Sequence, residues 1–123
     1  MNWFNLTCDL LAPLIMIGFG WRFMKKPPKD INGLYGYRTS MSMKNPDTWD
    51  FAHRTCGRIW LAVGLVMLAL AVLAWTQTLS YSVGDAGVLT AGISMLEAVV
   101  LILTIIPVER ALKRNFDKNG NRR

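Results

Sequence analysis

The chain contains one long stretch without charge. Between Arg58 and Asp85 lie 26 consecutive residues with no formal charge, most of them apolar. A helix needs about 20 apolar residues to cross the hydrocarbon core of a bilayer. The run IWLAVGLVMLALAVLAW is apolar on every side, whereas a membrane β-strand alternates apolar and polar residues over about ten positions. These residues predict a membrane-spanning α-helix.

Two more segments of the chain are long and apolar enough to span. The first covers about residues 3–24 and contains one acid, Asp9; the second covers about residues 86–108 and contains Glu97. The first has no basic residue before its apolar run and no small-residue cleavage site, so we expect it to be retained. The predicted fold class is an all-α integral membrane protein, a single domain built as a three-transmembrane-helix bundle.

The basic residues are distributed unevenly along the chain. Fourteen Lys and Arg against eight Asp and Glu give a net charge of +6. Residues 25–58 hold seven of the fourteen and residues 109–123 hold six, whereas the N-terminus and residues 76–85 hold none. The positive-inside rule therefore predicts an outer N-terminus, and a cytoplasmic loop (about 25–45) and basic tail (109–123). We expect these charges to meet anionic lipid rather than nucleic acid.

A long helix is predicted to follow the cytoplasmic loop. Pro27-Pro28 ends the first span, and the glycines that follow favour a compact turn. Asn45 suits the N-cap, Pro46 the first helical position and Asp47 the first turn. No breaker follows, so an amphipathic helix should run directly into the second span, over about residues 46–75.

Two faces of this helix differ in chemistry. Asp50 and Arg54 are four residues apart in the favourable order. Another face carries Trp49, His53, Cys56 and Trp60. One interpretation is that the charged stripe meets solvent or headgroups while the aromatic face packs on the loop. The other is that the loop and helix form a binding surface, as loops of this length often do.

Short motifs in the loop resemble a known family. The segments INGLYGYRT, SMKNPDTW and DFAHR are similar to the SdpI family of bacterial membrane proteins, over about residues 13–72. Its motif is a Gly-Tyr-Arg-Thr segment after the first helix and a Trp that opens the next. The residues of the candidate functional motif are Asn32, Gly33, Tyr35, Gly36, Tyr37, Arg38, Thr39, Ser42, Asn45, Asp47, Trp49 and Asp50.

The resemblance implies a function. One member of the family protects a toxin-producing bacterium against its own secreted antimicrobial peptide and signals by holding a transcriptional repressor at the membrane. It implies a multi-pass protein of the bacterial cell membrane for immunity or peptide sensing, with a peptide toxin and a cytoplasmic repressor as partners. Three spans fit this chain, whereas that member has additional helices.

Within the motif, Arg38 lies beside Tyr35 and Tyr37. An arginine can stack on an aromatic ring while its planar fork binds a carboxylate. We expect Asp47 or Asp50 to hold Arg38, and the alternative is a solvated or phosphate-bound side chain.

Other chemistry is poorly supported by the residues present. His53 is the one histidine and no paired cysteines accompany it, so we expect no metal site, no cofactor, no catalytic residue and no enzyme activity. Cys8 and Cys56 fall near opposite membrane faces, which excludes a disulfide between them. Gly87 and Ala91 form a small-xxx-small pair that suggests a homo-oligomer.

Asp9 and Glu97 are acids within predicted spans. Glu97 lies midway along residues 86–108, with no basic residue at comparable depth, and Asp9 is the other acid able to approach it. One interpretation is a neutral Glu97 that bonds to Thr90, Ser94 or a carbonyl group and fixes the bundle. Others are a proton-handling or peptide-amine-binding site, and a small oligomeric transporter or channel in which both acids line a path.

Overall fold

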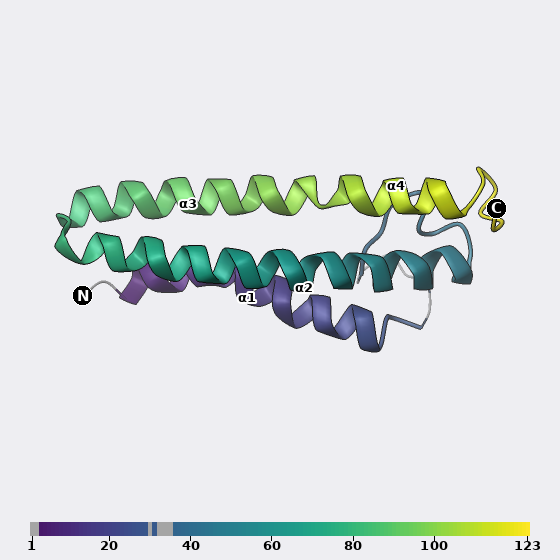
Figure 1. Cartoon of the computed structure of the whole chain (residues 1–123), viewed down its shortest axis with the longest axis horizontal. Coiled ribbons are helices and arrows are strands. Elements are labelled where there is room, and N and C mark those ends of the chain that lie inside the picture. The colour runs from purple at the N-terminus through teal and green to yellow at the C-terminus, as the bar shows by residue number, and fades with distance from the viewer. Residues whose placement is uncertain (1–2, 30, 32–35) are drawn as a thin grey trace.

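The computed structural model describes residues 3–29, 31 and 36–123 (Figure 1). Its helices are α1 (Trp3–Lys25), α2 (Pro46–Gln77), α3 (Val83–Leu103) and α4 (Ile105–Asn115), with a 3-10 turn η1 (Thr78–Ser80) between α2 and α3. Residues 3–25, 46–80 and 83–115 form three helical stretches long and apolar enough to cross a membrane. The prediction of an all-helical protein with three spans is confirmed.

Successive stretches run antiparallel, and α3 and α4 form one almost straight rod (Figure 1). The N-terminus lies at one end of the bundle, and the C-terminus and the α1–α2 loop lie at the other. We call the latter the basic end, because the basic residues of the chain gather in the segments that meet there. Among the helices, α1 packs most extensively on α2, and α3 packs more on α1 than on α2.

The N-terminus of α2 is capped from both directions. The side chain of Asn45 accepts the Thr48 N–H at 2.9 Å, and Thr48 Oγ1 accepts the Asn45 N–H at 3.1 Å. Pro46 occupies the first turn, where its missing N–H costs nothing. Beyond this cap α2 runs without interruption to Gln77, so the amphipathic part and the second span form a single helix.

The third spanning stretch differs from its predicted bounds. It begins at Val83, where the Ser82 side chain accepts the Asp85 N–H, and it is interrupted at Thr104. Pro107 lacks the N–H that would bond to the carbonyl of Leu103, which accounts for the break. Helix resumes as α4 and continues to Asn115, so half of the segment expected as a basic tail is helical.

Glycines allow α1 and α2 to touch through their backbones. A Cβ atom on Gly20 would lie 2.8 Å from the backbone N of Leu61 and 2.9 Å from the carbonyl oxygen of Gly57. A Cβ on Gly57 would meet the carbonyl oxygen of Gly20 and, at 2.6 Å, the backbone N of Met24. A Cβ on Gly87, in contrast, would meet no atom within 4 Å, so the predicted small-residue pair is not part of this contact.

Candidate functional site

The motif segment is bound to α2 through a buried imidazole. The Tyr37 N–H donates to His53 Nε2 at 2.8 Å, and His53 Nδ1 lies 2.8 Å from the Trp49 carbonyl oxygen. Because Nε2 accepts a hydrogen bond, the network assigns the ring hydrogen to Nδ1, which donates to Trp49. The side chain of His53 is fully buried, so it joins the loop to the helix as a neutral ring.

Gly36 allows the loop backbone to approach the His53 ring. Gly36 has φ +113°, a backbone conformation that side-chain-bearing residues rarely adopt. A Cβ at this position would lie 2.5 Å from His53 Nε2, the atom that accepts the Tyr37 N–H. Glycine is therefore needed at position 36 for two reasons: its φ is positive, and a side chain would collide with His53. This agrees with the compact turn that the sequence predicts. Asn32, Gly33 and Tyr35 of the same motif lie outside the described residues.

The next part of the motif is a turn closed by hydroxyl groups. Ser42 Oγ lies 3.1 Å from the Tyr37 carbonyl oxygen and 2.9 Å from that of Thr39, and it accepts the Thr39 N–H. Thr48 Oγ1 lies 3.1 Å from the carbonyl oxygen of Ser42, which connects the turn to the α2 cap. Ser42 and Thr48 are fully buried, so these bonds replace those that water would make.

Two aromatic side chains of the motif make hydrogen bonds to α4 and to the start of the loop. Tyr37 OH donates to Glu109 Oε1 of α4 at 3.1 Å, and burial followed by the negative charge of Glu109 raises the pKa of the phenol. Trp49 Nε1 donates to the carbonyl oxygen of Pro28 at 2.8 Å. The aromatic face of α2 thus packs on the loop, the first of the two interpretations of this helix.

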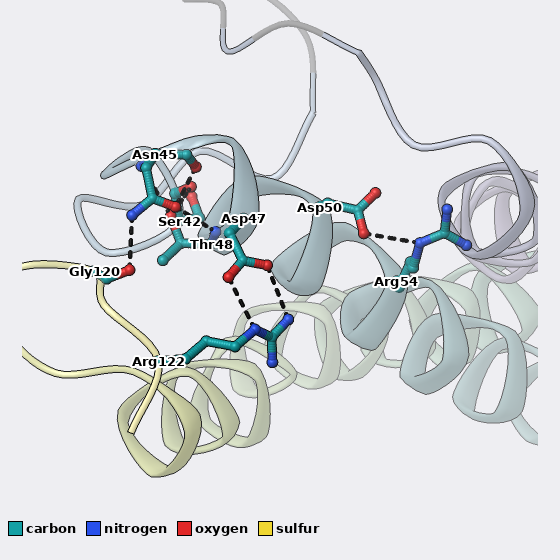
Figure 2. Close-up of polar contacts among 8 residues, drawn as sticks. All are labelled: Ser42, Asn45, Asp47, Thr48, Asp50, Arg54, Gly120 and Arg122. Carbon is teal, nitrogen blue, oxygen red and sulfur yellow. Dashed lines mark hydrogen bonds and ion pairs between the residues drawn. The ribbon is translucent and has the colours of Figure 1, made fainter.

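The C-terminal segment closes over the start of α2 (Figure 2). Asn45 Nδ2 donates to the carbonyl oxygen of Gly120 at 2.7 Å, and the Arg122 guanidinium binds both carboxylate oxygens of Asp47 at 2.9 Å. The same guanidinium lies 4.8 Å from the centre of the Phe116 ring. Asn45 and Asp47 therefore act in tertiary contacts as well as at the helix terminus. No local pattern links these positions, and the sequence analysis missed this contact.

The carboxylates expected to hold Arg38 are bound by other arginines. Asp47 binds Arg122, and Asp50 binds Arg54 at 3.0 Å, as the spacing on α2 predicts (Figure 2). Arg54 also donates to the carbonyl oxygen of Met24 near the end of α1. Arg38 is exposed, and neither of these two ion pairs includes it.

The two intramembrane acids lie inside the bundle. Asp9 of α1 is fully buried and Glu97 of α3 is 4% exposed. Their carboxyl oxygens, and the hydroxyl of Thr90, have no hydrogen-bond partner within the described residues. The interpretation in which Glu97 bonds to Thr90 is therefore not supported.

The described residues contain no group of three His, Cys, Asp or Glu side chains able to hold a metal ion. Cys8 and Cys56 are both free.

Replacing Arg122 with alanine should release the C-terminal segment without unfolding the bundle. Asp47 and Arg122 are each about half exposed, so we expect the loss of the pair to cost less than about 1 kcal/mol of global stability. Amide hydrogen exchange in residues 116–123 should speed up severalfold, because these residues lose one of their contacts with the start of α2. A matched Lys118→Ala variant should exchange like the wild type. Equal exchange in both variants would mean that the ion pair does not hold the segment.

Comparison with known proteins identifies a family that the chain matches. The model of the SdpI/YfhL protein family matches residues 29–108, which include the whole described motif. The uncharacterized protein YfhL of Bacillus subtilis (strain 168) is 40% identical over 47 residues, which cover 38% of this chain and 43% of that protein. The chain thus aligns with less than half of this relative. No solved structure matches the chain. Since the family model covers more than half of the sequence, the chain belongs to the SdpI/YfhL protein family.

Proposed function

We propose that the protein is a membrane immunity or peptide-sensing protein of the bacterial cell membrane. It protects the cell against an antimicrobial peptide and relays the presence of that peptide to a cytoplasmic partner such as a transcriptional repressor. The observation that carries the proposal is the motif itself. In this chain Tyr37, Thr39 and Ser42 of the motif form one hydrogen-bonded unit in contact with α2 and α4.

The contacts of that unit support the proposed relay. Tyr37 connects it to Glu109 of α4, and Trp60 of α2 donates to Thr104 Oγ1 at the α3–α4 break. A peptide that shifts α3 against α2 within the membrane would displace both contacts at once. The surface made by Asp47, Arg122 and the C-terminal segment would then change, and this surface is the one offered to the cytoplasmic partner.

The test is a challenge of living cells. A strain without this gene should be more sensitive to at least one secreted peptide toxin, and the wild-type gene should restore resistance. A His53→Leu variant at equal membrane abundance should not restore it, because the loop loses its bond to α2. An Arg58→Gln variant, altered at an exposed position of the same helix, serves as control. Equal sensitivity of deletion and wild-type strains to every peptide tested argues against the proposal.

A second candidate function is a small oligomeric transporter or channel that uses Asp9 and Glu97. Two buried carboxyl groups without partners in the described bundle favour it. Proteoliposomes that carry the wild type should then show proton or cation flux, and the Glu97→Gln variant should show less. Absence of flux from the wild type counts against this candidate.

The proposal requires an outer N-terminus and a cytoplasmic basic end. The basic residues lie in the α1–α2 loop, α4, the C-terminal segment and the ends of α1 and α2 that adjoin them, whereas the α2–α3 connection has none, so the positive-inside rule favours this orientation. Alkaline phosphatase inserted near Ser82 should be active in intact cells, and the same enzyme fused after Arg123 should be inactive. The reverse pattern of activity would contradict both the orientation and the proposed relay.

A further inference from the structure

A cavity lies at the basic end, between the turn that precedes α2 and the end of α4. Its volume is about 420 Å³, and half of the residues that line it are cations. They come from three parts of the chain: Lys44 from the turn, Lys113 from the last turn of α4, and Lys118 and Arg123 from the C-terminal segment. We call this space the basic cavity.

The positive charges of the basic cavity exceed its negative charge. Neither of the two ion pairs within the described part of the chain includes any of the four cations. The lining contains one acid, Asp117, whose Oδ1 accepts the backbone N–H groups of Asn119 at 2.9 Å and Asn121 at 3.0 Å. This carboxylate offsets only one of the four positive charges, so the cavity favours an anionic ligand.

Hydrogen bonds hold the backbone around the cavity in place. Arg123 Nε lies 3.0 Å from the carbonyl oxygens of Lys113 and Phe116, and Asn45 Nδ2 donates to the carbonyl oxygen of Gly120 (Figure 2). The C-terminal segment is thereby bound both to α4 and to the start of α2. A ligand meets cations whose backbone positions are already assembled, which lowers the entropic cost of binding.

The position of Lys113 along α4 places the cavity at the membrane surface. Lys113 follows Val108, the last residue of the predicted third span, by five residues. A helical rise of about 1.5 Å per residue puts it roughly 7–8 Å beyond the hydrocarbon core. The headgroup layer on each side of a bilayer is roughly 5–8 Å thick. The cavity therefore lies at the level of lipid phosphates.

Apolar surface adjoins the cations of the basic cavity. Ile106 is 48% exposed and lies seven residues before Lys113, so the two share one face of α4. Met41 and Phe116 contribute apolar side chains to the cavity lining itself. A ligand with a negative head and an apolar body would use both kinds of surface.

These features select among anions. A free phosphate ion is too small for a volume within the roughly 300–1,000 Å³ of ligand pockets, and it gains nothing from Ile106. An acidic peptide in the cytoplasm would also leave the apolar face of α4 unused. A phospholipid headgroup forms charge-assisted hydrogen bonds with Lys and Arg while its acyl chains remain in the bilayer, and basic pockets of helix bundles bind acidic headgroups in this way.

We propose that the basic cavity binds the phosphate headgroup of an anionic phospholipid, whose acyl chains lie along the face of α4 that carries Ile106. The bound headgroup bridges Lys44 and Lys113, and so it holds the turn before α2 against α4. This site does not depend on the recognition of a peptide.

The test measures lipid affinity. Native mass spectrometry of the full chain in detergent micelles gives the dissociation constant of the first bound lipid. Cardiolipin and phosphatidylglycerol should each bind about tenfold more tightly than phosphatidylcholine, because only the first two carry a net negative charge. Equal affinity for all three lipids overturns the inference.

Paired variants separate the cavity from a general attraction to basic residues. Lys44→Gln combined with Lys113→Gln should remove most of the preference for anionic lipid. Lys26→Gln combined with Arg58→Gln removes the same charge from exposed positions outside the cavity lining, and it should keep the preference. Circular dichroism confirms that each variant is helical, and Lys118→Gln carries the test if the first pair does not fold. An equal loss of preference in both pairs overturns the inference.

Hydrogen exchange locates the bound lipid. Cardiolipin should slow amide exchange in residues 40–44 and 113–121 of the wild type and leave residues 22–29 unchanged. Slowing confined to residues 22–29 would place the lipid at the end of α1 and contradict the assignment.

Two competitors test the other sources of negative charge. Neither inorganic phosphate nor a hexaglutamate peptide should displace cardiolipin when present at the same concentration. Displacement by inorganic phosphate would assign the cavity to a free anion. Displacement by hexaglutamate would assign it to an acidic protein partner, and either result overturns the proposal of a lipid.

Discussion

Replacing Gly57 with leucine should separate α1 from α2 and leave little folded protein in the membrane. A side chain at this position meets the carbonyl oxygen of Gly20 and the backbone of Met24, and backbone atoms cannot rotate away as a side chain does. Overpacking of a core costs about 1–3 kcal/mol, and we expect a value at or above the top of this range. Unfolding in mixed SDS micelles, followed by circular dichroism, measures the loss.

Gly18→Leu is the matched control for this variant. Gly18 lies on α1, and a Cβ added there meets no atom within 4 Å, so the same change in residue type should have little effect. If the Gly57 and Gly18 variants unfold at the same SDS fraction, the close contact between α1 and α2 does not determine stability.

Replacing Gly36 with alanine should break the contact between the loop and α2. The positive φ opposes any side chain, and the new methyl group would displace His53 Nε2 from the Tyr37 N–H. Backbone strain of about 1–2 kcal/mol and the loss of a buried hydrogen bond at about 1–3 kcal/mol together give roughly 3 kcal/mol. Protection of the Tyr37 amide against hydrogen exchange should fall in the same variant.

A double-mutant cycle assigns this cost to its cause. In a His53→Ala background the ring is gone, so Gly36→Ala should lose the part of its cost that comes from the collision and keep the part that comes from φ. A Gly84→Ala variant, at an exposed position without close neighbours, should be nearly neutral. Full additivity of the Gly36 and His53 changes would show that the two residues do not interact.

Interactions within one or two helical turns could be predicted from the sequence. The three spans follow from long apolar segments, because lipid requires every backbone group to bond within its own helix. The start of α2 at Asn45 and the Asp50–Arg54 pair follow from local spacing. The family resemblance pointed to the correct segment, although not to the hydrogen bonds that its residues make.

Only the tertiary structure decided which distant residues meet. Asp47 and Arg122 are 75 positions apart. They meet because α4 places the C-terminal segment beside the start of α2. The rotation of α1 against α2 brings Gly20 onto Gly57, and the packing of the helices buries Asp9 and Glu97. The sequence by itself determined the three spans and the start of α2, because those depend on bonds within each helix. Their faces and partners were set by packing, because apolar spans can associate in several rotations until small residues and polar groups select one.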